Sequence, residues 1–202
     1  MGSIAPRTLY RSSHPIKDNV QERVISILAN NARIAAVLNL SDTCSSVYTK
    51  AIFAPWYNAL LKNRRVIALG MNLSVTSESF KKKLKAGLQF IIKTEGPWLV
   101  HCHAEVDRTG YVSMVLESFM GAALDDVIND YLRSFNSIFE SSIYESQKAD
   151  SRVAMQILSV MSGSMAINDQ NLQSVAEIYL QKSIGLSAEE IELLKRKLAR
   201  IQ

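Results

Sequence analysis

The sequence predicts an α/β protein with a mostly parallel central sheet of about four to five strands flanked by helices. The first observation is that short apolar runs, bounded by glycine, proline or polar residues, alternate with longer segments of helical period. The second is that 202 residues with 48% hydrophobic content suffice for one domain with a sizeable core. Alternating strands and helices favour right-handed crossovers, which place functional loops at the carboxyl edge of a parallel sheet.

The predicted strands all lie before residue 103. Pro15 precedes the first helical segment, Ser77 can cap a later helix, and Gly96-Pro97 bounds the last apolar run. The predicted strands are 10–11, 36–40, 66–69 and 99–102, of which the first is an edge strand and the last is central, and helices are predicted over 19–33, 46–62 and 78–93.

The second half of the chain is predicted to be helical. Ser187 and Glu190 form the pattern of a capping box, which predicts a helix over 187–200. Further helices with serine-rich breaks are expected over 141–183. From Thr109 onward the apolar spacing is helical, and it predicts these core residues: Val112, Val115, Leu116, Phe119, Leu124, Val127, Ile128, Tyr131 and Leu132.

Composition and charge exclude several classes of protein. The net charge is +4, and its densest cluster, at 81–85, is typical of a solvated helix face. The basic residues are not interleaved with aromatic residues, which argues against nucleic acid as a partner. The apolar runs are too short for an integral membrane segment. Two cysteines do not make a disulfide scaffold, so we expect a cytoplasmic protein or one exported without a visible cleavable signal.

The segment 97–110 combines a strand end, a cysteine and the start of a helix. Cys102 opens the predicted loop, where inward N–H groups and the helix dipole would bind a phosphate dianion and favour the thiolate. The planar fork of Arg108 can hold two phosphate oxygens. Thr109 can donate its hydroxyl to the sulfur, and Gly110 lets the helix start pack closely. The segment therefore predicts a phosphate-ester site.

The His-Cys-x5-Arg-Thr pattern at 101–109 resembles the signature of the cysteine-dependent protein tyrosine phosphatases. The segments 9–15, 37–42 and 110–132 are similar to the bacterial members of that family, which include dual-specificity enzymes. The resemblance implies a single phosphatase domain over 1–202, with a catalytic core at 8–140 and a helical lid or extension at 141–202. It also implies a cysteinyl-phosphate intermediate and no metal or organic cofactor.

Two loop residues depart from the family pattern. Glu105 and Val106 stand where the bacterial relatives usually carry Gly-Lys, so the loop gains a carboxylate and loses an ammonium group. The loss of the lysine and the gain of Glu105 both argue against a polyanionic lipid headgroup. The glycine of such a loop often has a backbone conformation that costs other residues roughly 1 kcal/mol or more. We therefore expect strain at Glu105 and reduced activity.

Two aspartates are candidates for the general acid that protonates the leaving group. Asp107 lies beside Arg108 and matches the loop aspartate to which the relatives' acid/base role is attributed. Its alternative role is a hydrogen bond that stabilises the loop. Asp42 follows a strand that ends on the same edge of the sheet, and its alternative role is a turn or helix cap.

The remaining candidates surround Cys102 or resemble family segments. His101 is expected to be a buried imidazole that supports the loop, with a role as base the alternative. Arg11 and Ser12 could approach the site, although a structural role for Arg11 is equally open. A zinc site is not expected, because adjacent residues rarely face one metal. The loop residues expected to bind the phosphate are His103, Ala104, Glu105 and Val106.

The second cysteine and the substrate leave further hypotheses. Cys44 lies near the predicted site edge, so a reversible disulfide with Cys102 is one hypothesis and an ordinary loop thiol the other. The favoured substrate is phosphotyrosine in a protein, alone or with phosphoserine and phosphothreonine. A phosphoinositide or inositol-phosphate substrate is the alternative, and a phosphate-binding pseudophosphatase is the second alternative. The sequence indicates no oligomeric state.

Overall fold

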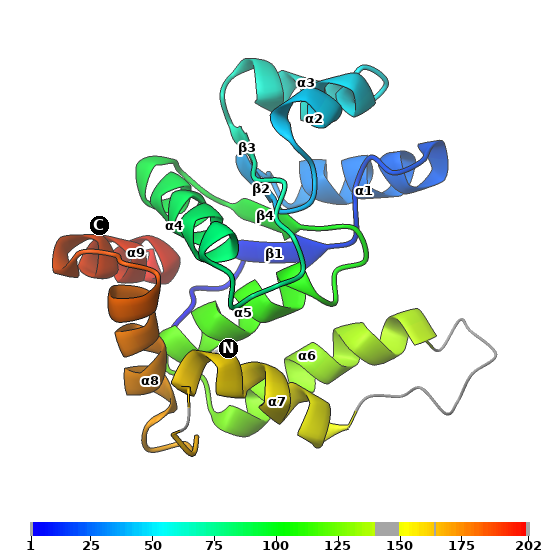
Figure 1. The fold of residues 1–202 in the computed structure, drawn as a ribbon. Coiled ribbons are helices and arrows are strands. Elements are labelled where there is room, and N and C mark those ends of the chain that lie inside the picture. Colours follow the sequence, from blue (N-terminus) through cyan, green and yellow to red (C-terminus); the bar gives the residue numbers. More distant parts are fainter. Residues whose placement is uncertain (1, 140–149, 164, 201–202) are drawn as a thin grey trace.

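The computed structural model describes residues 2–139, 150–163 and 165–200, and these form helical layers on both faces of a parallel sheet (Figure 1). In the described residues the sheet has four strands in the order β1-β4-β2-β3, which confirms the predicted fold class. All three pairings are parallel. The strands are β1 (Leu9–Ser12), β2 (Ala36–Asn39), β3 (Val66–Ala68) and β4 (Trp98–His101).

The register of the sheet aligns the carboxyl ends of its strands. Ser12 of β1 and Asn39 of β2 both pair with His101 of β4, and Asn39 pairs in turn with Ala68 of β3. Because β4 lies between β1 and β2, the residue that follows it emerges in the interior of this edge. That residue is Cys102.

One face of the sheet is covered by α1 (Asn19–Asn31), α2 (Cys44–Ala51) and α3 (Pro55–Lys62). The predicted helical segment 46–62 is therefore two helices rather than one. The physical reason is Pro55, which occupies the first turn of α3, where its missing N–H costs nothing, and which a helix interior would not accommodate. A small cluster on this face includes Val37, Leu99 and Tyr57.

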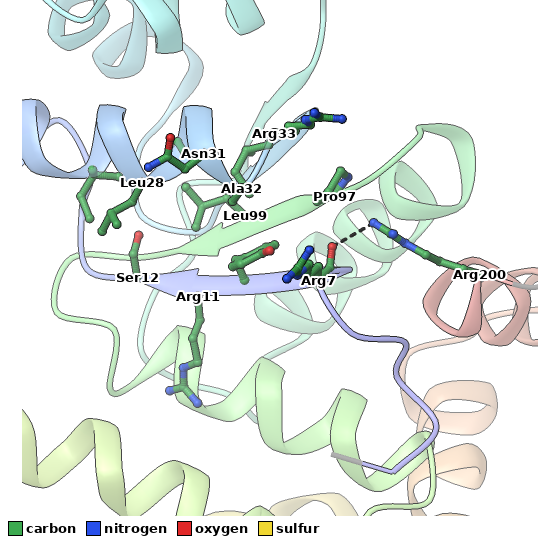
Figure 2. Close-up of a pocket in the computed structure, with 14 residues that line it drawn as sticks. Arg7, Arg11, Ser12, Leu28, Asn31, Ala32, Arg33, Pro97, Leu99 and Arg200 are labelled. Carbon is green, nitrogen blue, oxygen red and sulfur yellow. Dashed lines mark hydrogen bonds between the residues drawn. The ribbon is translucent and has the colours of Figure 1, made fainter.

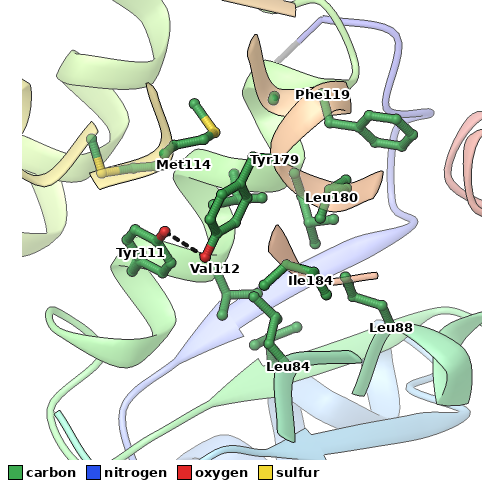
Figure 3. Packing of buried hydrophobic residues seen from close by; sticks show 14 of the residues in the cluster. Leu84, Leu88, Tyr111, Val112, Met114, Phe119, Tyr179, Leu180 and Ile184 are labelled. Atoms are coloured by element: carbon green, nitrogen blue, oxygen red, sulfur yellow. Dashed lines mark hydrogen bonds between the residues drawn. The ribbon is translucent and has the colours of Figure 1, made fainter. Parts of the chain in front are cut away.

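The other face carries the larger hydrophobic cluster, which joins the sheet to all the later helices. Helix α5 is buried along its length from Thr109 to Phe119, and the Tyr111 hydroxyl donates to that of Tyr179 at 2.8 Å (Figure 3). The elements of this side are α4 (Glu78–Lys93), α5 (Arg108–Phe119), α6 (Leu124–Phe139), α7 (Ser151–Ser162), α8 (Leu172–Ile178), a π-helical turn (Tyr179–Ser183) and α9 (Ala188–Ala199).

The ends of two helices confirm their predicted caps. The Ser77 side chain accepts the N–H of Phe80, and Ser187 and Glu190 form the reciprocal bonds of a capping box. These bonds satisfy N–H groups that have no partner within the helix. The predicted helix over 187–200 ends at Ala199, because Arg200 has a left-handed backbone. The predicted boundary at 140–141 lies outside the described residues.

Helix α9 lies far from the edge that carries Cys102. The ammonium group of Lys197, in its last turn, pairs with Glu95, just before β4 begins. The Arg200 guanidinium donates to the carbonyl of Arg7, which precedes β1. The end of α9 therefore packs at the amino ends of the strands and supports α4, rather than covering the loop after β4. Among the described residues, no helix is long and apolar enough to cross a bilayer.

Candidate active site

The loop from Cys102 to Asp107 joins the end of β4 to the start of α5. The Cys102 side chain is buried at the base of this loop. Asp107 occupies the N-cap position of α5, but its side chain makes no capping hydrogen bond. The first N–H groups of α5 are therefore not satisfied by a side chain, and the positive end of the helix dipole lies beside the cysteine. This is a favourable place for an anion.

Arg108 is fixed at one nitrogen and free at another. Its Nη1 donates to the carbonyl of Met71 at 2.9 Å, and this bond orients the guanidinium from the loop after β3. Its Nε is buried and has no hydrogen-bond partner in the described structure. A buried guanidinium nitrogen without a partner is uncommon, and it leaves the fork ready to hold an oxyanion.

Thr109 contributes a second unpartnered polar atom to the same place. Its side chain is fully buried, and its hydroxyl has no hydrogen-bond partner among the described residues. Six buried side-chain polar atoms in the described residues have no partner, and Arg108 Nε and Thr109 Oγ1 are the two that lie at the start of α5, directly after the loop of Cys102, where an oxyanion could accept from both. The arrangement can bind a tetrahedral oxyanion and present it to a thiol.

Glu105 has the left-handed backbone that the family glycine predicts, with φ of 73°. The strain expected at this residue is therefore confirmed. Its carboxylate lies 3.1 Å from the Nε of Arg11, in an ion pair rather than an aligned hydrogen bond. Arg11 also donates to the Glu105 carbonyl at 3.3 Å. Arg11 thus neutralises the added carboxylate and holds the loop backbone from β1.

The comparisons with known proteins agree with this geometry. A family model described as the tyrosine phosphatase family matches residues 2–200. The chain belongs to the tyrosine phosphatase family. The match extends beyond the 8–140 region in which the family segments were recognised, so it includes the C-terminal helices of the phosphatase. A search of the curated proteins finds no match.

A pair of carboxyl groups, one buried and one partly buried, lies beside Arg11 in the phosphatase. Arg11 pairs with Asp130 of α6, and Asp130 shares a hydrogen bond with Glu117 of α5. Burial is the main cause that raises the pKa of Glu117 to about 8, and the nearby charge of Asp130 adds to it. Glu117 is therefore protonated at neutral pH. The sequence reasoning missed this residue, whose only signal is a carboxyl group inside an otherwise apolar helix.

The structure surrounds Asp42 with hydrogen-bond donors. Its buried carboxylate accepts bonds from His14 Nε2 at 2.7 Å, Lys50 Nζ at 2.6 Å and Asn39 Nδ2 at 2.8 Å. Burial alone would raise the pKa of Asp42, but the bonds from His14, Lys50 and Asn39 outweigh it and hold that pKa far below its ordinary value. A carboxylate kept ionised in this way cannot supply a proton at neutral pH. Its contacts hold together His14, Asn39 and Lys50 near the carboxyl edge of the sheet, which is a structural role.

His101 is buried behind the loop and held by a chain of hydrogen bonds. Asn39 donates to the Tyr57 hydroxyl at 3.0 Å, and that hydroxyl lies 2.9 Å from Nε2 of His101. This leaves Nδ1–H to face the Cys102 carbonyl at 3.3 Å. Burial lowers the pKa of His101 to about 3, so the imidazole is neutral. Its contacts position the backbone of the loop.

The other loop residues differ in exposure. Asp107 is exposed and its carboxylate makes no hydrogen bond with the described residues, so it is free to meet a ligand at the mouth. His103 is also exposed, and its carbonyl accepts the N–H of His14. Partial burial and the charge of Lys17 lower the pKa of His103. Ala104 is half-buried, and the Val106 side chain packs into the large cluster.

Two further predicted residues lie beside the loop. The Ser12 hydroxyl donates to the carbonyl of Ser13 at 2.7 Å, at the end of β1. Gly110 lies against α6, where an added Cβ would meet a ring carbon of Tyr131 at 2.9 Å. Only a glycine at this position therefore lets α6 approach the start of α5, and α6 carries Asp130.

The two cysteines are both free thiols. Cys44 is exposed at the start of α2, with its Sγ 3.8 Å from the Ala68 carbonyl, whereas Cys102 is buried. A disulfide between them stays a prediction. Within the described ranges, no group of three histidine, cysteine, aspartate or glutamate side chains could hold a metal ion.

Proposed function

We propose that this member of the tyrosine phosphatase family hydrolyses phosphotyrosine in proteins through a cysteinyl-phosphate intermediate. The observation that carries the proposal is the pair of unpartnered polar atoms, Arg108 Nε and Thr109 Oγ1, beside Cys102 at an uncapped helix start. These atoms and the loop N–H groups would bind the oxygens of the transferred phosphoryl group.

In the first step the Cys102 thiolate attacks phosphorus. The S–P bond forms as the bond from phosphorus to the tyrosine oxygen breaks, and Asp107 gives its proton to the leaving oxygen. Arg108 follows the equatorial oxygens through the transition state. Asp107 is preferred to Asp42 as the acid because its carboxyl group is exposed and free, whereas Asp42 is held ionised.

In the second step water attacks the phosphorus of the intermediate. Asp107 accepts a proton from the water, the S–P bond breaks, and inorganic phosphate leaves. The Thr109 hydroxyl donates to the sulfur as the thiolate returns, which eases its departure. No step requires a group other than water and the residues of this chain.

A monophosphate ester on tyrosine suits this loop better than a lipid headgroup with several phosphates. The loop lacks the lysine of the bacterial pattern, and Arg11, which reaches the loop from β1, is already paired with Glu105 and Asp130. Phosphoserine and phosphothreonine remain within the proposed class. Initial rates on phosphotyrosine, phosphothreonine and phosphoinositide substrates at matched concentration test this choice, and a clear lipid preference contradicts it.

The mechanism is tested with para-nitrophenyl phosphate and a phosphotyrosine peptide between pH 5 and 8. Cys102→Ser is expected to lose all activity, while Cys44→Ser, the matched control, keeps it. Asp107→Asn is expected to lower kcat about 10²–10⁴-fold, the usual contribution of a general acid. Trapping of a phosphorylated Cys102 peptide by mass spectrometry identifies the intermediate. A wild-type chain that binds vanadate but turns over neither substrate would instead be the pseudophosphatase.

A further inference from the structure

A groove lies between the edge strand β1 and helix α1, with a cavity volume of about 970 Å³ (Figure 2). Ser12 and Leu99 lie on the sheet side of the groove, Leu28 lines it from α1, and Ala32 lines it directly after α1 (Figure 2). Tyr10 of β1 also lines it. The Arg11 side chain points to the opposite face of β1, toward Glu105 and Asp130. The groove is therefore separate from the contacts that hold the catalytic loop.

Three arginines gather at one end of this groove. Arg7 precedes β1, Arg33 follows α1, and Arg200 follows α9, so three distant segments converge there. All three are exposed, and none forms an ion pair with a described residue. No aspartate or glutamate lines the groove. Like charges placed together without a counter-charge attract an anion.

The same three arginines share an unfavourable backbone conformation. Arg7, Arg33 and Arg200 have φ of 59°, 54° and 52°, the left-handed region that favours glycine or asparagine. At a helix end this position is usually glycine. The Arg200 guanidinium also donates to the Arg7 carbonyl at 2.9 Å, which ties two of the three segments together (Figure 2). Each of the three arginines therefore occupies a position where glycine or asparagine would have less backbone strain.

The strand beside the groove has one unused edge. In the described sheet β1 pairs only with β4, so half of its backbone hydrogen-bonding groups face away from the sheet. An extended peptide can add to such an edge as a further strand. The five residue steps from Arg7 to Ser12 span about 17 Å. Ser12 pairs with His101, which Cys102 follows, so the far end of the strand reaches the catalytic edge.

We propose that this groove binds an extended acidic segment of the phosphoprotein substrate. The segment adds to the free edge of β1 and places carboxylate groups among Arg7, Arg33 and Arg200, while its phosphotyrosine enters the loop at Cys102. This inference rests on the proposed function, because it assigns the substrate chemistry of the same site. The groove thereby selects substrates that carry acidic residues about five to six positions from the phosphotyrosine.

Binding is measured with the Cys102→Ser chain and three fluorescent phosphotyrosine peptides. Two carry a pair of glutamates five and six positions away, one on the N-terminal side and one on the C-terminal side, and the third carries glutamines at both places. One glutamate peptide is expected to bind about tenfold tighter than the glutamine peptide at low salt, and less so at high salt. Whichever side is preferred gives the direction of the added strand.

The arginines are tested by substitution to asparagine, which removes the charge and tolerates the left-handed backbone. Arg7→Asn/Arg33→Asn/Arg200→Asn is expected to abolish the preference for glutamate. Arg64→Asn is the matched control, because Arg64 has φ of 57° and is exposed but does not line the groove. It is expected to keep the full preference and the full rate on para-nitrophenyl phosphate.

Hydrogen–deuterium exchange distinguishes strand addition from a general attraction of charges. The segment 8–12 is expected to exchange more slowly when the preferred glutamate peptide is bound. Equal affinities for all peptides, an equal loss in Arg64→Asn, or no protection of 8–12 would overturn the proposal. So would arginine-dependent binding to phosphatidylserine vesicles without any peptide preference. Hydrolysis of para-nitrophenyl phosphate by the wild-type chain tests the proposed function separately, since that substrate has no peptide.

Discussion

Glu105 brings a negative charge into the loop that we propose binds a phosphate dianion, and Arg11 is a residue that offsets this charge. The same guanidinium pairs with Asp130, so one cation serves two carboxylates. Because Arg11 is paired with both carboxylates, its positive charge does little to attract the substrate. The charge of Glu105, one of the two residues that depart from the pattern of the resembling loops, is therefore compensated from β1, outside the loop itself.

Removing Arg11 should show how far an uncompensated Glu105 carboxylate lowers activity. In Arg11→Met we expect kcat/KM for para-nitrophenyl phosphate to fall about tenfold, which corresponds to ~1.4 kcal/mol, because the unpaired carboxylates repel the dianion. Arg11→Met/Glu105→Gly removes the repelling charge nearest the loop and relieves the left-handed backbone. It is expected to recover most of the loss. A double variant as slow as Arg11→Met would show that Arg11 acts on the substrate directly.

Glu117 makes stability depend on pH in a specific direction. Its pKa is raised from an ordinary 4.5 to about 8, so between these values the unfolded chain releases a proton that the folded chain keeps. Stability contributed by the protonated group is thus full below about pH 4.5 and is lost as pH rises toward 8. Glu117→Gln is a neutral mimic that does not titrate.

Urea unfolding of both chains at pH 5, 6, 7 and 8 measures this effect. The free energy of unfolding of the wild type, minus that of Glu117→Gln, should fall by on the order of 1 kcal/mol per pH unit over this range. Asp130 and Arg11 are present in both chains, so the difference reports on Glu117. A difference that stays constant with pH would contradict the protonated state assigned to Glu117.

At the scale of elements, the approach of α6 to α5 depends on Gly110. A methyl group there would meet the Tyr131 ring at 2.9 Å, so Gly110→Ala should push α6 outward. We expect a loss of about 1–3 kcal/mol of stability, typical of overpacking. Activity should also fall, since α6 carries Asp130, the partner of Arg11.

The matched control for this prediction is Gly110→Ala/Tyr131→Leu, which removes the ring that the new methyl group would meet. It should unfold at a higher urea concentration than Gly110→Ala and should regain part of kcat/KM. If Gly110→Ala alone is as stable as the wild type, the close approach of the two helices does not depend on the glycine.

Local signals in the sequence predicted most of the elements, and long-range contacts explain what they missed. Ser77 and Ser187 predicted helix starts because a cap is made within four residues. The apolar period over 46–62 did not reveal the break before Pro55. The roles of Cys102 and Arg108, predicted from their spacing, stay predictions. The contacts of His14 and Lys50 with Asp42, and of Glu117 with Asp130, join segments whose separation follows no pattern.

For the whole molecule, we infer that the chain is one folding unit rather than a core with a dispensable extension. Helix α5 is buried from Thr109 to Phe119, and residues of α7, α8 and α9 belong to the same hydrophobic cluster as β4. The family match also runs through α9. Removal of the C-terminal helices would therefore expose the central helix to water.

A fragment of residues 1–140 is accordingly expected to lose fixed tertiary packing. It should bind the dye ANS and show little near-ultraviolet circular dichroism, the marks of a molten globule. The full chain should unfold in one transition by tryptophan fluorescence and by far-ultraviolet circular dichroism. Cooperative unfolding of the 1–140 fragment would show that the core is independent.

The burial of α5 has a practical consequence for directed evolution of this phosphatase. One end of the helix follows the Cys102–Asp107 loop, its flank packs against α8, and its Tyr111 bonds to Tyr179 in the π-helical turn after α8. A change of side-chain volume on the inner face of α8 would shift the helix that carries Arg108 and Thr109 without altering either residue. Libraries of substitutions at Leu172, Val175 and Ala176 would thus change the position of the loop and would leave its own side chains unchanged.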